Sequence, residues 1–257
     1  MEETLKNSIK WTNRIYREKH NQERFRFFNT TVHESDLHIG IDPAVYSVDV
    51  ENTAQNEVKR IRKVLESYFS RFPEFLTSLK PLNHDMEDSF EIRDMKKAAL
   101  KAGVGPMAAV AGLTSELAGR KLLAKYYPKE IIVENGGDIW AKIKEPLFVE
   151  IFAGESPLSG KIMLKIPPEK TPLGICTSSG TVGHSFSFGK ADAVVISCHD
   201  ASLADALATA VCNIMKTEND IEKAGNYMSG FREILSAVII IGDKVYVSGS
   251  FDIHPSN

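Results

Sequence analysis

Residues 171–210 carry the side chains best suited to binding a phosphate ester and a metal ion. Four hydroxyl groups and two glycines stand within residues 177–183. Glycine lets backbone N–H groups approach an anion closely, and hydroxyl groups can donate to its oxygens. A plain surface turn is the alternative interpretation, because serine, threonine and glycine also favour turns. The residues expected to contact the ligand are Thr177, Ser178, Ser179, Gly180 and Thr181.

A helix that follows this segment carries an acidic residue. Residues 190–197 are typical of a buried strand, and polar residues at 199–202 favour the start of a helix. Asp205 and Thr209 are four positions apart, so their oxygens face the same side of that helix. A carboxylate and a hydroxyl group suit Mg²⁺, which takes few protein oxygens and completes its shell with water or phosphate. The sequence therefore predicts a magnesium site made by Asp205 and Thr209.

Composition excludes several classes of partner. The chain has 257 residues and a formal net charge of -3. This charge provides no basic surface for nucleic acid or for an anionic membrane. We find no apolar stretch of signal-peptide or membrane-spanning length, so we expect a cytoplasmic protein. Cys176, Cys198 and Cys212 are odd in number and contain no Cys-x-x-Cys pair, which argues against a disulfide framework or a zinc site.

The remaining pattern consists of strands in hairpins with helices between them. Residues 24–32 and 36–41 predict a first hairpin, and 130–134 and 139–143 predict a second around an Asn-Gly-Gly-Asp turn. Apolar residues at helical spacing predict a helix from about residue 52 to 72. Further helices are expected at 91–102, 107–120, 199–211 and around 221–224, and further strands at 146–153, 160–166, 190–197 and within 235–248.

Strands in hairpins indicate antiparallel sheets, and the helices between them would cover one face. The expected fold class is therefore α+β. The order of elements suggests a duplicated ββααββ arrangement, in which one domain over residues 1–257 contains two closely packed halves at about 23–145 and 146–250. Exposed hairpin edges would also be compatible with a homodimer.

Four segments together resemble a known family. They are Gly105-Pro-Met-Ala-Ala-Val-Ala-Gly112, Val133-Glu-Asn-Gly-Gly-Asp-Ile139, Thr177-Ser-Ser-Gly180 with His184, and Ala204-Asp-Ala-Leu-Ala-Thr-Ala210. They occur in the order seen in ApbE-like proteins, the FAD:protein FMN transferases. The chain looks still more like an uncharacterised archaeal and bacterial branch of that superfamily. The resemblance implies an ApbE-like, T-fold-like arrangement.

The resemblance also implies roles for particular residues. Asp205 and Thr209 would hold Mg²⁺, and the segment 177–180 would face the phosphates of FAD or FMN. In the expected reaction, a threonine hydroxyl of a target protein attacks the FMN-side phosphorus of FAD, and AMP leaves. A bound Mg²⁺ would neutralise charge on the pyrophosphate. Asp205 and His184 would be catalytic, and the flavin nucleotide site would be lined by Asn135, Gly136, Gly137 and Asp138.

Two departures from the transferases keep other functions open. The transferases carry a Lys-Gly pair and a nearby Asp where this chain has residues 109–116, and an Asp-Pro-x-Thr-Gly segment where it has residues 185–190. A binding module that holds the nucleotide without chemistry is one alternative. A hydrolase that uses Ser178 or Ser179 with His184 is another, although the Gly-x-Ser-x-Gly elbow is missing.

Overall fold

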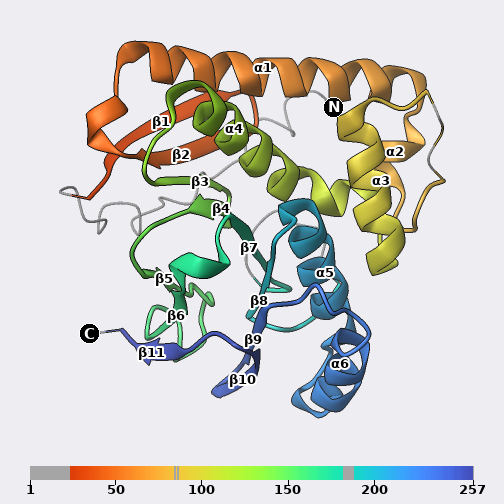
Figure 1. Cartoon of the computed structure of the whole chain (residues 1–257). Helices are drawn as coiled ribbons and strands as arrows, with labels where there is room; N and C mark the ends of the chain where they lie inside the picture. Colours follow the sequence, from red (N-terminus) through yellow and green to blue (C-terminus); the bar gives the residue numbers. More distant parts are fainter. Residues whose placement is uncertain (1–23, 84, 86, 182–187, 257) are drawn as a thin grey trace, which may run out of the picture.

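The computed structural model describes residues 24–256 except 84, 86 and 182–187 (Figure 1). The helices are α1 Val48–Arg71, α2 Glu74–Thr77, α3 Phe90–Ala102, α4 Val110–Tyr126, α5 Ala201–Ile214 and α6 Ile221–Met228, with the short 3₁₀ helix η3 Pro106–Ala109 leading into α4. The strands are β1 Arg26–Val32, β2 Ser35–Ile41, β3 Ile131–Asn135, β4 Asp138–Lys142, β5 Leu147–Glu150, β6 Ile162–Ile166, β7 Leu173–Ser178, β8 Ala193–Cys198, β9 Ser236–Ile241, β10 Lys244–Gly249 and β11 Ile253–Pro255.

Two antiparallel sheets organise these strands. The larger sheet has eight strands in the order β1-β2-β3-β4-β7-β8-β9-β10, and the smaller has the order β11-β6-β5. The strand pairs β1–β2, β3–β4, β7–β8 and β9–β10 are each antiparallel and consecutive in the chain, as in hairpins. The prediction of an α+β fold with antiparallel sheets is confirmed.

Residues 146–166 contribute strands to the smaller sheet. They supply β5 and β6 as predicted; β6 is the central strand of the smaller sheet and pairs with β5 on one side and β11 on the other. The next strands of the larger sheet are β7 and β8. The larger sheet thus contains two four-stranded groups, β1–β4 and β7–β10. In each group the chain forms two strands, then helices, then two more strands. A division of the chain into halves near residue 146 stays a prediction.

The sequence pattern does not predict strand β7, because residues 177 and 178 have the composition of a turn. The strand lies in the middle of the larger sheet, between β4 and β8. Its side chains alternate between two buried layers, because Cys176 belongs to the core on one face and Leu173 and Ile175 to the core on the other. Two-sided burial of a strand removes the apolar–polar alternation by which strands are recognised.

The helices cover one face of the larger sheet, and the smaller sheet covers the other. Helices α1 and α4 lie over β1–β4, and α5 lies over β7 and β8 (Figure 1). The core beneath the helices includes Trp140, which is fully buried. Ala193 and Val195 of β8 point to the opposite core, beside the smaller sheet, whereas Val194 and Ile196 point to the helices. This alternation follows from the two-residue period of a strand.

Local signals set the ends of the helices as expected. The Ser89 hydroxyl accepts a hydrogen bond from the Ile92 amide at the start of α3, and Gly103 ends that helix with a φ of 70°. Asp200 caps α5, since its carboxylate accepts from the Leu203 amide at 2.9 Å. Polar caps and a left-handed glycine are the usual start and stop signals of helices.

Helices α4 and α5 cross in close contact at Gly112. A β-carbon at this position would lie 2.2 Å from the Ala201 carbonyl oxygen. The crossing also carries a hydrogen bond, because the Glu116 carboxylate of α4 accepts from the Ala201 amide at 2.8 Å. A carboxylate is favourable at a helix N-terminus. Glu116 therefore holds the start of α5 against α4.

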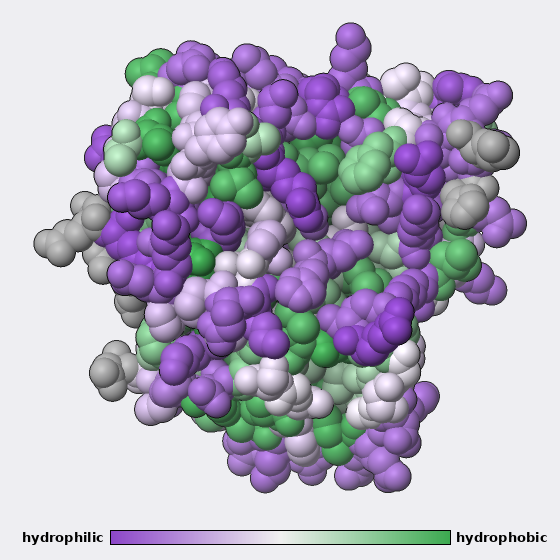
Figure 2. Space-filling view, viewed as in Figure 1, coloured by the Kyte–Doolittle hydropathy of each residue, from purple (hydrophilic) through white to green (hydrophobic). Residues whose placement is uncertain are grey.

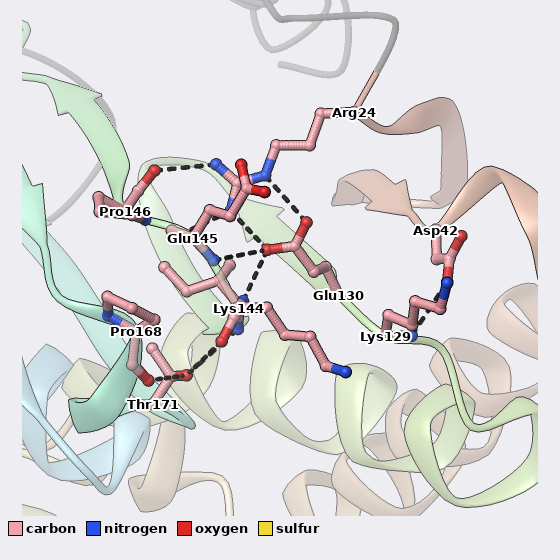
Figure 3. Close-up of polar contacts among 10 residues, drawn as sticks. Arg24, Asp42, Lys129, Glu130, Lys144, Glu145, Pro146, Pro168 and Thr171 are labelled. Carbon is pink, nitrogen blue, oxygen red and sulfur yellow. Dashed lines mark hydrogen bonds and ion pairs between the residues drawn. The ribbon is translucent and has the colours of Figure 1, made fainter.

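A polar network joins the beginning of β1 to the link between the two sheets (Figure 3). The Arg24 guanidinium donates to both carboxylate oxygens of Glu130, at 2.9 and 2.5 Å. It also donates to the carbonyl oxygens of Glu145 and Pro146. Glu130 accepts from the amides of Lys144 and Glu145 as well, at 2.7 and 3.2 Å. One carboxylate thus ties together three segments that are distant in sequence.

In the described part of the chain, no helix combines the length and apolar character needed to cross a membrane. Hydrophilic residues are spread over most of the face seen in Figure 2, with hydrophobic residues in smaller groups between them.

We predict that Glu130→Gln destabilises the protein at neutral pH and has less effect in acid. Burial raises the pKa of Glu130, whereas the hydrogen bonds from Arg24 and the two amides lower it. The lowering outweighs the effect of burial, so the pKa lies below its ordinary value of 4.5. A carboxyl group whose pKa is lower in the folded state than in the unfolded state stabilises the folded protein. The stabilisation is fully present above the unfolded-state pKa and is lost as the pH falls through the folded-state pKa. The free energy of unfolding should drop by about 1–3 kcal/mol at pH 7.

Urea denaturation of the wild type and Glu130→Gln between pH 7 and pH 3 measures this difference. The gap between the two proteins should shrink below about pH 4.5. Glu169→Gln is the matched control, because Glu169 is exposed. A gap that stays constant with pH would show that the Glu130 charge does not contribute.

We also predict that Gly112→Ala destabilises the crossing of α4 and α5. The added methyl group would have to displace backbone, so the free energy of unfolding should fall by about 1–3 kcal/mol. Gly225→Ala in α6 is the control, since a β-carbon there meets nothing within 4 Å. It should leave stability unchanged or raise it by about 0.5–1 kcal/mol. Equal melting temperatures for Gly112→Ala and Gly225→Ala would contradict the close contact at Gly112.

Candidate functional site

The Asn-Gly-Gly-Asp turn joins β3 to β4 and brings two polar residues to the helix side of the sheet. Gly136 and Gly137 both have positive φ, 68° and 108°, which explains why the turn needs two glycines. Asn135 donates from its side-chain amide to the Ala111 carbonyl oxygen at 3.3 Å. Asp138 begins β4 directly opposite Asn135. The turn therefore lies against the first residues of α4.

Asp138 is buried between β4 and β7. Its Oδ1 accepts from the Thr177 backbone amide at 3.1 Å. Burial is the main reason that the pKa of Asp138 rises to about 7, and the negative charge of Glu134 adds to it. Hydrogen bonds from the Thr177 amide and the Cys176 thiol act in the opposite direction. A nearby positive charge would favour the ionised form of this buried carboxyl group.

Asp205 projects from α5 toward the N-terminus of α4. Its Oδ2 accepts from the amides of Ala111 and Gly112, at 3.1 and 2.9 Å. These are among the free N–H groups in the first turn of a helix, so the carboxylate caps α4. Burial nevertheless raises the pKa of Asp205 well above its ordinary value, and the charge of Asp138 raises it further. The two acids thus lie close enough to oppose each other's ionisation.

Two hydroxyl groups lie beside the acid pair. Thr209 is one helical turn after Asp205, and its hydroxyl is 3.1 Å from that of Ser178 at the end of β7. Asp205 and Thr209 are partly exposed, whereas Ser178 is buried. The structure therefore brings together residues from the hydroxyl-rich segment, the two-glycine hairpin and the acidic helix.

The amides of the hydroxyl-rich segment already have partners within the chain. The Gly180 amide donates to the Ala191 carbonyl oxygen at 2.9 Å, and the Thr181 amide donates to the Ser179 hydroxyl at 3.1 Å. The Thr181 hydroxyl donates to Asp192. Because the Thr177 amide is bound to Asp138, a ligand would have to compete for these groups. Ligand contact by residues 177–181 stays a prediction.

His184 and Gly183 lie outside the described residues. The Ser178 hydroxyl contacts the Thr209 hydroxyl at 3.1 Å, and the Ser179 hydroxyl contacts that of Thr181 at 3.4 Å. A serine nucleophile needs a neighbouring base, so the hydrolase alternative with His184 stays a prediction.

Cys176 is a member of this cluster that sequence reasoning did not place there. It is fully buried, and its Sγ donates to the Ala201 carbonyl oxygen at 3.4 Å. Burial, the charges of Asp138 and Asp205 and a hydrogen bond with Asp138 raise the pKa of the thiol well above its ordinary value. A thiol held in its protonated form is a poor nucleophile. Alternation along β7, which puts Cys176 and Ser178 on the same face, is the signal that would have found it.

The donor set suits a hard divalent cation. Two carboxylates and two hydroxyl groups come together, and the repulsion between Asp138 and Asp205 would be relieved by a positive ion. In the described part of the chain, no group of three or more His, Cys, Asp or Glu side chains is arranged to hold a metal alone. Mg²⁺ fits such a site, because it is commonly bound by one or two carboxylates together with substrate phosphate and water.

Two surface clefts lie away from this cluster. One, of about 390 Å³, lies between α1 and α4 and includes Arg60 and Lys125. The other, of about 440 Å³, is lined by Phe90, Asp94, Glu116, Arg120, His199 and Asp200. Neither cleft includes Asp138 or Asp205. The accessible part of the cluster is formed by the exposed surface of Asp205 and Thr209.

Comparison of the sequence with known families identifies close relatives. A family model described as AbpE bacteria matches residues 17–227. A UPF0280 protein of Methanocella arvoryzae is 43% identical over 192 residues, which cover 75% of this chain and 78% of the relative. A UPF0280 protein of Methanospirillum hungatei is 42% identical over 194 residues, covering 75% of this chain and 79% of the relative.

Solved structures share the fold at low sequence identity. The flavin transferase ApbE from Vibrio cholerae superposes with a TM-score of 0.58 and 13% identity, covering 91% of this chain and 97% of that one. The ApbE protein of Thermotoga maritima gives a TM-score of 0.57 and 12% identity, covering 87% and 97%. The ApbE-like arrangement implied by the sequence motifs is confirmed. Since the family model spans most of the sequence, the chain belongs to the family described as AbpE bacteria, an ApbE-like branch, and its archaeal relatives are UPF0280 proteins.

Proposed function

We propose that the protein binds a flavin nucleotide with Mg²⁺ at the cluster around Asp205 and transfers FMN from FAD to a hydroxyl group of a target protein. The observation that carries the proposal is the pairing of Asp138 and Asp205 beside the hydroxyls of Ser178 and Thr209. Like charges held close together favour a cation between them. The flavin transferases named among the solved relatives share the fold.

In this proposal, Asp205 and Thr209 hold Mg²⁺, and Asp138 adds a second negative charge beside them. Mg²⁺, when bound, supplies charge neutralisation for the pyrophosphate. The Asp205 Oδ2 is bound to the amides of Ala111 and Gly112, which fixes the carboxylate and leaves its Oδ1 to face a cation. The 135–138 turn would line the nucleotide, because the Asn135 side chain contacts Ala111 in the first turn of α4, where Asp205 is also bound.

The reaction is a substitution at phosphorus. The oxygen of the target hydroxyl forms a bond to the FMN-side phosphorus, and the bond from that phosphorus to the bridging oxygen breaks. AMP leaves with the bridging oxygen, and the hydroxyl proton passes to solvent or to a base. We assign His184 as a catalytic residue on the sequence resemblance alone.

A binding module without chemistry is the second candidate function. The absence of the Lys-Gly pair from residues 109–116 favours it. In the structure, α4 presents Glu116 and no lysine to the start of α5 at this place. Nucleotide and metal binding is common to both candidates, and only cleavage of FAD separates them.

We predict that the protein releases AMP from FAD in a Mg²⁺-dependent reaction and that Asp205→Asn slows this release by about 100-fold or more. The substitution removes the negative charge of the proposed metal ligand without changing the size of the side chain. Chromatography of the nucleotides after incubation with FAD and Mg²⁺ measures the release. Asp243→Asn, in the exposed turn between β9 and β10, is the control and should behave as wild type. Intact, bound FAD would favour the binding module.

We also predict that Mg²⁺ and FAD together raise the melting temperature more than either does alone. A ligand at 100 times its dissociation constant stabilises the folded state by about 2.7 kcal/mol. Asp205→Asn should lose the Mg²⁺-dependent part of the shift, because Asp205 is the charged ligand of the proposed pair. A Mg²⁺-dependent shift that survives this substitution would contradict the metal assignment.

A further inference from the structure

Helix α5 carries a polar stripe that continues beyond the proposed metal site. From Ala201 to Cys212 the helix is buried except at Asp205 and Thr209, which are partly exposed. Asn213 follows four residues after Thr209 and is also partly exposed. Residues four apart lie near one another on a helix surface, so these three side chains form one stripe. At 1.5 Å per residue the stripe is about 12 Å long.

Each position of the stripe faces a different segment. Asp205 contacts the amides of α4, and Thr209 contacts Ser178. The side-chain oxygen of Asn213 accepts from the Phe188 backbone amide at 2.7 Å. The stripe thus runs from the acid pair at one end to Phe188 at the other.

The backbone at Phe188 is held against the end of α5. Besides the bond to Asn213, the Phe188 carbonyl oxygen accepts from the Lys216 side chain. A β-carbon at Gly189 would lie 1.7 Å from the Cys212 carbonyl oxygen, which shows how closely the segment packs on the helix. The Lys190 amide donates to the Met215 carbonyl oxygen at 2.7 Å. The segment is therefore anchored at several successive residues.

The side chain of Phe188 nevertheless points outward and is 56% exposed. Single exposed apolar side chains are common and need no explanation by themselves. This one differs in its position, because it stands at the end of the stripe that begins at the proposed phosphate and metal site. Its backbone is also fixed by hydrogen bonds, and a fixed backbone lowers the entropy lost when an aromatic ring binds a ligand.

We propose that the Phe188 ring stacks on the planar heteroaromatic ring of the nucleotide whose phosphates bind at Asp205 and Thr209. The inference rests on the proposed function and adds a residue that selects for a nucleotide over a simple phosphate ester. A nucleotide needs two separate contact points, because a sugar or ribityl chain lies between its phosphate and its ring. The α5 stripe provides such a separation, with charge at one end and an aromatic face at the other.

Titration of FMN, AMP and FAD, each with Mg²⁺, into the wild type and Phe188→Ala tests the proposal by calorimetry. Stacking of a base on an aromatic side chain corresponds to about 5-fold to 100-fold in affinity, so Phe188→Ala should weaken binding by this factor. A loss confined to FMN assigns the isoalloxazine ring to Phe188, and a loss confined to AMP assigns the adenine ring. Inorganic phosphate should bind equally to both proteins.

Two further variants separate stacking from a structural role. Phe188→Trp should keep the affinity, because tryptophan also offers a flat aromatic face. If the partner is isoalloxazine, it should also quench the fluorescence of bound FMN more strongly than Phe188→Ala does. Phe152→Ala is the matched control, since Phe152 is 54% exposed and its neighbours Ile151 and Ala153 belong to the core on the other face of the sheet.

The outcomes distinguish failure of the stacking role from failure of the proposed function. Wild-type binding of FAD that is unchanged in Phe188→Ala would overturn the stacking role and leave the proposed function intact. Equal losses in Phe188→Ala and Phe152→Ala would overturn it as well. A wild type that binds none of the three nucleotides would overturn the proposed function together with this inference.

Discussion

Two helices that cross over the sheet each place a carboxylate on the N-terminal amides of the other. Asp205 of α5 accepts from Ala111 and Gly112 at the start of α4, and Glu116 of α4 accepts from Ala201 at the start of α5. The contact is close enough that Gly112 has no room for a side chain. This reciprocal capping fixes the position of Asp205 relative to the strands below. The geometry of the candidate site depends on it.

The same arrangement places two carboxyl groups, Asp138 and Asp205, where their negative charges repel each other. Holding Asp205 at the α4 terminus also holds it near Asp138, and burial raises the pKa of both carboxyl groups. A folded protein tolerates such a pair more easily when a cation or a proton lies between the charges. The hydroxyls of Ser178 and Thr209 add neutral oxygens without further negative charge. The site thus suits an ion that also contacts phosphate.

Local patterns predicted part of this site and topology supplied the rest. The four-residue spacing of Asp205 and Thr209 and the two glycines at 136 and 137 depend only on neighbours in sequence, so both features could be recognised in advance. Strand β7 could not, because its two-sided burial and its hydroxyl groups hide the alternation of a strand. The approach of Asp138 to Asp205 joins residues 67 positions apart. The pairing of β4 with β7, the packing of α5 on β7 and the crossing of α4 and α5 bring them together.

The central claim is that Asp205 and Thr209 bind a divalent cation together with a nucleotide phosphate. A crystal structure of the protein with FAD and Mn²⁺ in place of Mg²⁺, with anomalous scattering recorded from the manganese, tests it most directly. The account predicts an anomalous peak bonded to the Asp205 carboxylate, beside the Thr209 hydroxyl and a phosphate oxygen of the nucleotide. A nucleotide bound elsewhere, or bound here with the manganese peak away from Asp205, would contradict it.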